Sequence, residues 1–243
     1  MGLTIHYQLD TQADWTDEEV RARLEVLGDY ARHLGCDNVG EVLPAHKRQD
    51  VTDKLHQIGR GLDVRWVAIH AHGGWILPIE IGAGCEPFML ALCCYPSRWK
   101  CRHGRSMHRW HPTKISANWQ FSWFCKTQFA GRHGLAHFIR CHKTVISLLD
   151  FCRKAGLDVA VRDESDYWAD RDETRLVKTI KRNEALMAAF GGLIKDVAEK
   201  KRGHTVRSPI FDYYHFEHLE HEGWQRFGDV FSSMFKDGLQ NEI

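Results

Sequence analysis

Five residues along this chain are of types that transfer protons or bind anions: His6, Lys126, Gln128, His142 and Asp163. Lys126 and Gln128 have the least ordinary setting, because they stand two positions apart in residues 119–130, an aromatic-rich stretch that resembles a strand. An unpaired charge on such an apolar strand is costly. We therefore expect Lys126 to face an acidic residue such as Asp163 or an anionic ligand. His6, His142 and the acids would then be the proton-transfer groups of an enzyme.

A second group of residues has the side chains of a zinc site. Four residues of the types that bind zinc fall within eleven positions, namely Cys101, His103, His108 and His111. Their spacing matches no standard finger or ribbon, and the surrounding cations would repel a metal ion. A role of these histidines in phosphate contacts, beside the arginines, is the competing interpretation. His133, His137 and Cys141 also share one side of a predicted helix, either as ligands or as a partly buried flank.

The charge distribution is uneven along the chain. Residues 87–149 contain ten Lys and Arg and no Asp or Glu, so the rest of the chain carries a net charge of −9. If these cations share a surface, they attract phosphate-bearing partners: a nucleotide, a nucleic acid or a phosphorylated metabolite. The alternative is that the acidic turn at residues 163–172 and an acidic first helix neutralise them within the fold.

Most of these cations lie in one predicted loop, residues 96–118. The candidate ligand-binding residues are Arg98, Lys100, Arg102, Arg105, Arg109 and, outside the loop, Arg140. Trp99 and Trp110 stand among them and could stack on bases.

The elements that must position these residues follow from hydrophobic spacing. Leu3, Ile5, Tyr7 and Leu9 alternate with polar residues and predict a first strand, with His6 on its polar face. Thr16 and Glu19 form a capping box for a helix over residues 16–34. Residues 64–72 and 75–81 flank Gly73-Gly74 and predict a tight hairpin. Residues 87–95 predict a strand buried on both faces.

Further along, helical spacing predicts a second helix over residues 134–154 and a third that ends near Gly203. Residues 157–161 predict a short strand, and the segment from about residue 205 is expected to wrap back over the core. This order predicts one α+β domain over residues 1–243. It should hold a mainly antiparallel mixed sheet of about five to six strands and three main helices, with a basic loop insertion at about 96–118.

Composition excludes several classes of protein. A 43% hydrophobic and 27% charged chain is a folded globule rather than a disordered or fibrous chain. We find no apolar run long enough to cross a membrane and no secretory signal, so eight cysteines without an export signal predict reduced thiols and a cytoplasmic protein. There is no phosphate-binding glycine loop, nucleophile elbow, zinc ribbon or dinucleotide fingerprint.

Several segments of the sequence are similar to segments of known proteins. They are MGLTIHY at the start, FCKTQFA at 124–130, FIRCHKTVISLLD at 138–150, the DES and DYW of residues 163–168, and FEHLE at 216–220. Together they resemble an uncharacterised family of bacterial proteins of about this length. The resemblance implies a bacterial cytoplasmic protein and no particular reaction. The basic loop has no counterpart in that resemblance.

Three hypotheses of function follow. The first is an enzyme or binding protein for a phosphate-bearing small ligand or nucleotide, with Lys126, Gln128, Arg140, His142 and His6 near the pocket. The second is a nucleic-acid-associated protein that uses the basic loop at 98–114. The third is an interaction module without a catalytic site, in which the cations meet an acidic protein partner. The sequence leaves open whether the protein is an enzyme.

Overall fold

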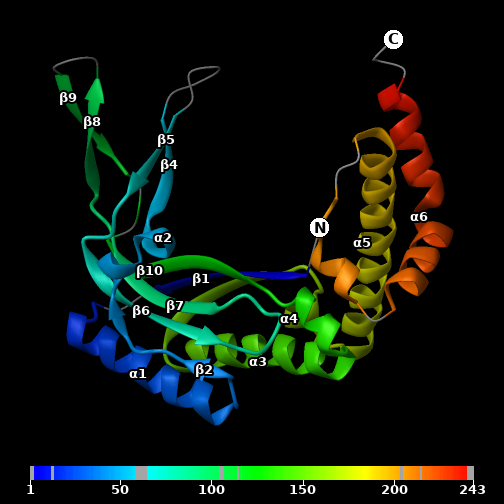
Figure 1. Ribbon diagram of the computed structural model, residues 1–243. Coiled ribbons are helices and arrows are strands. Elements are labelled where there is room, and N and C mark those ends of the chain that lie inside the picture. Colours follow the sequence, from blue (N-terminus) through cyan, green and yellow to red (C-terminus); the bar gives the residue numbers. More distant parts are fainter. Residues whose placement is uncertain are drawn as a thin grey trace. The chain divides into compact units, whose positions relative to one another are not determined.

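The structure is a computed structural model that describes residues 3–11, 14–58, 65–103, 107–113, 115, 117–202, 205–213 and 215–239. For residues 55–58, 65–66, 99–103, 107–109, 111, 199–202 and 232–239 it describes the backbone alone. The contacts group the chain into two compact units, which we describe separately (Figure 1). The sheet unit comprises Ile5–Cys125 and Cys141–Arg162, and the helical unit comprises Met1–Thr4, Lys126–Arg140 and Asp163–Ile243.

The main sheet has the strand order β11-β1-β10-β7-β6-β2, and β3 also pairs with β6. In that order the strands are β11 (Leu157–Asp163), β1 (Thr4–Thr11), β10 (Gln120–Lys126), β7 (Phe88–Cys94), β6 (Gly73–Glu80) and β2 (Asn38–Val39), with β3 at Leu43–Pro44. The pairs β10–β7, β7–β6, β6–β2 and β6–β3 are antiparallel. The predicted α+β class with a mainly antiparallel sheet is confirmed, whereas a single domain over residues 1–243 stays a prediction.

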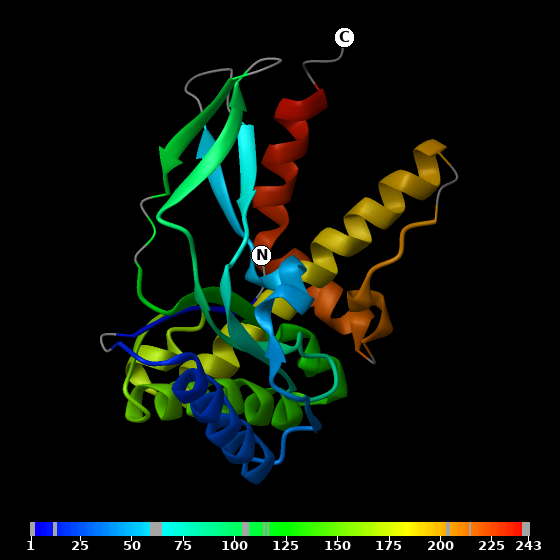
Figure 2. The same cartoon turned by 90° about the vertical axis from the view of Figure 1, so that its left-hand side faces the viewer.

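Two helices cover one face of this sheet, α1 (Asp17–His33) and α3 (Leu135–Lys154) (Figures 1 and 2). Thr16 and Glu19 form the predicted capping box of α1. The rings of Tyr30 and Phe151 stack with their centroids 4.0 Å apart and join the two helices. Burial of apolar side chains between these layers is the main force that holds the unit together.

The predicted hairpin around Gly73-Gly74 is wrong. Strand β5 (Arg65–Ile69) pairs with β4 (Lys54–Ile58) in a separate two-stranded sheet, and both glycines lie inside β6 opposite β7. Gly74 has φ +132°, and a Cβ there would lie 2.4 Å from the carbonyl oxygen of Leu92. The glycine therefore allows a close approach of two strands rather than a turn. Between β3 and β4 lie a 3-10 helix η1 (Ala45–Arg48) and a short α2 (Gln49–Thr52).

The basic loop contains a two-stranded antiparallel ribbon rather than irregular chain. Strands β8 (Arg98–His103) and β9 (Met107–Pro112) pair with each other, with Arg98 opposite Pro112 and Lys100 opposite Trp110. The chain enters and leaves this ribbon at one point, because the backbone N–H of Thr113 donates to the carbonyl of Ser97 at 2.9 Å. Cations in place of alternating apolar residues hid these strands from the sequence pattern.

The strand predicted over residues 119–130 ends early. Thr127 has helical backbone angles, and a 3-10 helix, η2 (Gln128–His133), follows. Lys126 is therefore the last residue of β10 while Gln128 lies in η2, so the expected side-by-side placement of these two side chains on one strand is wrong.

The helical unit contains the turn after β11, a short α4 (Tyr167–Asp170), the long α5 (Glu173–Arg202), the 3-10 helix η3 (Pro209–Asp212) and α6 (Phe216–Leu239). The predicted C-terminal tail is thus mostly a 24-residue helix. Helices α5 and α6 cross very closely, because a Cβ on Gly223 would lie 2.0 Å from the carbonyl oxygen of Ala185. Among the described helices, none combines the length and apolar character needed to cross a bilayer.

Candidate functional site

The face of the sheet opposite α1 and α3 carries a shallow groove of about 500 Å³ over β1, β10 and β11. The groove is lined by His6, Tyr7, Gln8, Ser122, Trp123, Phe124, Ala160, Val161 and Arg162. All nine residues belong to the sheet unit. We call the surface formed by His6, Gln8, Ser122, Phe124 and Arg162 the open sheet face.

Strand alternation explains why these residues share a surface. Leu3, Ile5, Tyr7 and Leu9 of β1 are buried, which leaves His6 half-buried and Gln8 exposed on the other face. On β10, Phe121 and Cys125 are buried, while Ser122 is exposed and Phe124 half-buried. The strands run antiparallel, as the bonds from Thr11 N to Trp119 O and from Thr127 N to Leu3 O show at their two ends.

Aromatic rings occupy the middle of the open sheet face. The centroids of His6 and Phe124 lie 6.0 Å apart, and Phe124 stacks against Trp123 at 5.3 Å with an interplanar angle of 15°. A planar ligand ring can stack on such half-buried aromatic side chains. Ala160 of β11 is exposed in the same groove, and its small side chain leaves space for a ligand beside β1.

Arg162 supplies the charge of the open sheet face. It is exposed at the end of β11 and forms no ion pair within the described residues. A guanidinium in this state can hold a phosphate or carboxylate in a bidentate manner. The other two side chains of the open sheet face are neutral donors and acceptors, the Ser122 hydroxyl and the Gln8 amide. The Gln8 amide donates to Asp10 at 2.6 Å.

The five sequence-predicted catalytic residues fall in both units. His6 and His142 belong to the sheet unit, and Lys126, Gln128 and Asp163 belong to the helical unit. His6 lies on the open sheet face, as its place on the polar side of the first strand predicts. His142 is fully buried in α3, on the same stripe as Phe138, Val145 and Leu149. In this structure His142 is therefore part of the core and is closed to a ligand.

Gln128 has a structural contact in the helical unit. Its side-chain oxygen accepts a hydrogen bond of 2.9 Å from the buried backbone N–H of Leu3, and the hydroxyl of Tyr213 donates to its carbonyl at 3.3 Å. Lys126 is half-buried at the end of β10, and Arg140 is exposed on α3 in the same unit. The contact of Gln128 satisfies a buried donor and gives the residue a role without a ligand.

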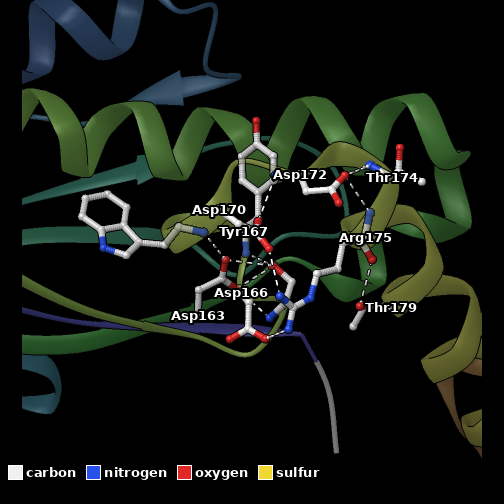
Figure 3. Close-up of polar contacts among 10 residues, drawn as sticks. Asp163, Asp166, Tyr167, Asp170, Asp172, Thr174, Arg175 and Thr179 are labelled. Atoms are coloured by element: carbon white, nitrogen blue, oxygen red, sulfur yellow. Dashed lines mark hydrogen bonds and ion pairs between the residues drawn. The ribbon is translucent and has the colours of Figure 1, made fainter.

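Asp163 organises the acidic turn of the helical unit, shown in Figure 3. Its carboxylate accepts hydrogen bonds from the backbone N–H of Ser165 at 2.9 Å, the Ser165 hydroxyl at 2.8 Å and the backbone N–H of Trp168 at 3.0 Å. Asp166 has a positive φ of 62°, a left-handed conformation that Asp tolerates better than most residues. The carboxylate of Asp163 therefore fixes the entry into α4.

The rest of the acidic turn binds a cation of its own unit. Arg175 of α5 pairs with Asp170 at 2.9 Å and with Asp166 (Figure 3). The backbone N–H of Asp172 donates to Asp170, and Asp172 in turn accepts the backbone N–H groups of Thr174 and Arg175. Two carboxylates of the turn are thus matched by Arg175, a residue outside the basic block of residues 87–149.

The ribbon formed by β8 and β9 is rich in cations, and hydrogen bonds hold it where the chain enters and leaves it. The Thr113 side chain is buried and donates to the carbonyl of Pro96 at 2.8 Å. Arg98 is exposed, and Trp110 is 58% exposed, which is unusual for so large an apolar side chain. The side chains of Lys100, Cys101, Arg102, His103, Arg105, His108, Arg109 and His111 lie outside the described residues. The zinc site expected from four of them therefore stays a prediction.

Within the residues whose side chains are described, no group of three or more His, Cys, Asp or Glu is placed to hold a metal. This applies to the row of His133, His137 and Cys141, where the two histidine rings meet edge to face at 5.4 Å and Cys141 is fully buried. Burial also raises the pKa of the Cys125 thiol, so that this cysteine is an inert core residue.

Sequence reasoning missed Arg162, Gln8 and Ser122. The signal for Arg162 is the alternation of exposed and buried residues along β11, which places it on the same side as Asp158 and Ala160. That pattern shows that Arg162 faces outward, but it does not show which strand lies beside it.

Comparison with protein-family models, with curated proteins and with solved structures found no match. The resemblance to an uncharacterised bacterial family stays a prediction from the amino-acid sequence of these segments.

Proposed function

We propose that the open sheet face binds a phosphate-bearing small ligand, a nucleotide, with the phosphate at Arg162 and the base on Phe124. The observation that carries this proposal is the juxtaposition, in one groove, of a half-buried ring pair and an exposed arginine that pairs with no carboxylate in the described part of the chain. Stacking and a bidentate charge-assisted hydrogen bond are the two interactions that recognise the two ends of a nucleotide.

His6 supports the choice of a phosphate ester over a neutral ring. Its imidazole lies beside Phe124 in the same groove and can donate to an anionic oxygen when protonated. In an enzyme it would also be the group that takes or gives the proton during hydrolysis of the ester.

The test is isothermal titration of the full chain with nucleoside mono-, di- and triphosphates. Arg162→Gln should weaken binding about 10- to 100-fold, as expected for loss of a charged hydrogen-bond donor. Phe124→Ala should weaken binding of a nucleotide but not of inorganic pyrophosphate. Arg32→Gln is the matched control, because Arg32 is an exposed arginine of α1 that pairs with Asp29.

Equal affinities of the parent protein and Arg162→Gln would overturn the proposal. Phosphate release with each nucleotide measures whether binding leads to a reaction. If it does, His6→Gln should lower the rate far more than the affinity.

A second candidate function is binding of nucleic acid by the ribbon of β8 and β9. It is supported by the exposed Trp110 and by six cations without an acid between residues 98 and 114. An antiparallel two-stranded ribbon fits a groove of a duplex, and its charges contact phosphates. The bond between Thr113 and Ser97 brings the ends of the ribbon together, so a short turn can replace residues 98–112.

This candidate is tested with a fluorescent duplex over a range of salt concentrations. The shortened variant should lose salt-dependent duplex binding and keep nucleotide binding. Retention of duplex binding by the shortened variant would exclude the ribbon as the contact surface.

A further inference from the structure

Beyond the groove, the same side of β10 leads to Gln120, a buried residue that accepts a hydrogen bond from a lysine of another strand. Lys54 is the first residue of β4, and its ammonium donates to the side-chain oxygen of Gln120 at the start of β10. It also lies over the ring of Tyr95, 4.7 Å from the centroid. Gln120, Ser122 and Phe124 are every second residue of β10 and therefore point to the same side of the sheet. The contact with Gln120 thus places Lys54 at the end of this side.

The charge of Lys54 is only partly compensated. Lys54 is half-buried and forms no ion pair with a carboxylate within the described residues. Burial lowers its pKa, and the negative charge of Asp10 opposes that shift from beyond ion-pair distance. The ammonium has three donors, and Gln120 is a neutral acceptor for one of them. An anion at this position would regain the free energy that burial takes from the charge.

The distance between Lys54 and the groove is longer than the spacing of adjacent nucleotides along a strand. Phe124 lies four positions after Gln120 on β10, a distance of ~13 Å at the usual rise of a strand. Stacked nucleotides advance by about 3.4 Å each along a strand, so that distance corresponds to about four of them, or fewer in an extended chain. Between the two ends the face offers Gln8 and Ser122, neutral groups that suit base edges and sugar hydroxyls. The carboxylate of Asp10 accepts the Gln8 amide beside them, so the phosphodiester must approach Lys54 away from Asp10.

We propose that the open sheet face binds a short single-stranded nucleic acid, with Lys54 on a phosphodiester and the groove at Phe124 and Arg162 on a nucleotide further along the strand. This inference rests on the proposed nucleotide binding and extends it from a single nucleotide to a linked series. A single strand fits better than a duplex, because only unpaired bases can lie flat on exposed rings of a sheet. The ribbon of β8 and β9 is not needed for this contact.

The test measures the affinity of the full chain for oligonucleotides from one to about six nucleotides long, a range that covers the spacing between the two ends. In the parent protein the affinity should rise with length up to about four nucleotides and then level off. Lys54→Gln should leave mononucleotide affinity within about 2-fold and lower the affinity of the longer oligomers about 10-fold, the effect of one lost charged contact. Lys54→Arg should retain most of the gain with length.

Lys47→Gln is the matched control, because Lys47 is an exposed lysine of η1 in the same unit. An unchanged length dependence in Lys54→Gln would overturn the inference, and a lower melting temperature of that variant without a change in binding would identify Lys54 as a brace between β4 and β10. Failure of the proposed function has a different signature: Arg162→Gln would then bind mononucleotides as well as the parent does. In the variant whose residues 98–112 are replaced by a short turn, a duplex that binds better than the single strand of the same length would also overturn the inference.

Discussion

The side-chain oxygen of Gln128 accepts a hydrogen bond from the backbone N–H of Leu3, 125 positions earlier in the chain. Both groups are buried, so this bond satisfies a donor that water cannot reach. It ties the beginning of β1 to η2, and it accounts for a polar residue that would otherwise be taken for a catalytic group.

Gln128→Ala should therefore lower the free energy of unfolding by about 1–3 kcal/mol, the usual cost of a buried donor without a partner. Urea denaturation measures this loss. Gln8→Ala, which removes an exposed amide, should stay within about 0.5 kcal/mol of the parent protein. Equal stabilities of the parent and Gln128→Ala would show that Leu3 N–H finds another acceptor.

Asp163→Ala removes the acceptor of three hydrogen bonds in the turn before α4. We expect a loss of about 1–3 kcal/mol in the free energy of unfolding. Asp163→Asn keeps one carbonyl oxygen and should lose less. Asp14→Ala, at an exposed position, serves as the control in the same denaturation series. A stability of Asp163→Ala equal to that of the control would contradict the structural role.

Glu184 makes the stability of the helical unit depend on pH. It lies beside Gln128, Asn183 and Tyr213, and burial raises the pKa of its carboxyl to about 7, against a smaller opposite effect of Lys181. The folded chain thus holds this proton more tightly than the unfolded chain does. The free energy of unfolding should fall between about pH 4.5 and 7 and stay level above that range, as far as Glu184 contributes.

Glu184→Gln should abolish this contribution and raise the free energy of unfolding at pH 8 by up to about 2 kcal/mol, allowing for the partial exposure of the carboxyl. At pH 4 the variant and the parent should be alike. Unfolding curves at several pH values measure the difference. A gap between the two proteins that is the same at pH 4 and pH 8 would contradict the raised pKa.

Gly223 sets the distance between α5 and α6. Because a Cβ there would meet the carbonyl oxygen of Ala185 and the Cβ of Ala189, Gly223→Ala should force the helices apart. The expected loss is about 2 kcal/mol or more. Gly228→Ala lies on the same helix with only an ordinary contact to Trp224, and should gain up to about 1 kcal/mol from helix propensity. Thermal denaturation of the two variants should therefore move the melting temperature in opposite directions.

Local patterns were sufficient for many elements. The alternation from Leu3 to Leu9 predicts β1, the capping box at Thr16 predicts the start of α1, and the apolar run before Tyr95 predicts β7. Each of these signals depends on residues within a few positions of one another. The same kind of signal failed at β8 and β9, where cations replace the apolar residues that mark a strand.

The candidate site was only partly accessible to the same reasoning. His6 was placed on a polar strand face and lies on the open sheet face, whereas His142 shows the ambiguity of a polar residue on an apolar stripe and is buried. Arg162 and Lys54 come from β11 and β4, more than a hundred residues apart, and neither has a local pattern that marks it as a ligand.

The sequence alone determined which side is buried in the elements with a clear apolar pattern, such as β1 and α1, since the spacing of apolar side chains must match the period of a helix or strand. Only the tertiary structure decided which strands are neighbours, and with them the assembly of His6, Phe124 and Arg162 into one groove. The physical reason is that a strand exposes the same backbone donors and acceptors to every partner. The choice of partner depends on packing against α1 and α3 and on close approaches such as that at Gly74, contacts that no short stretch of sequence contains.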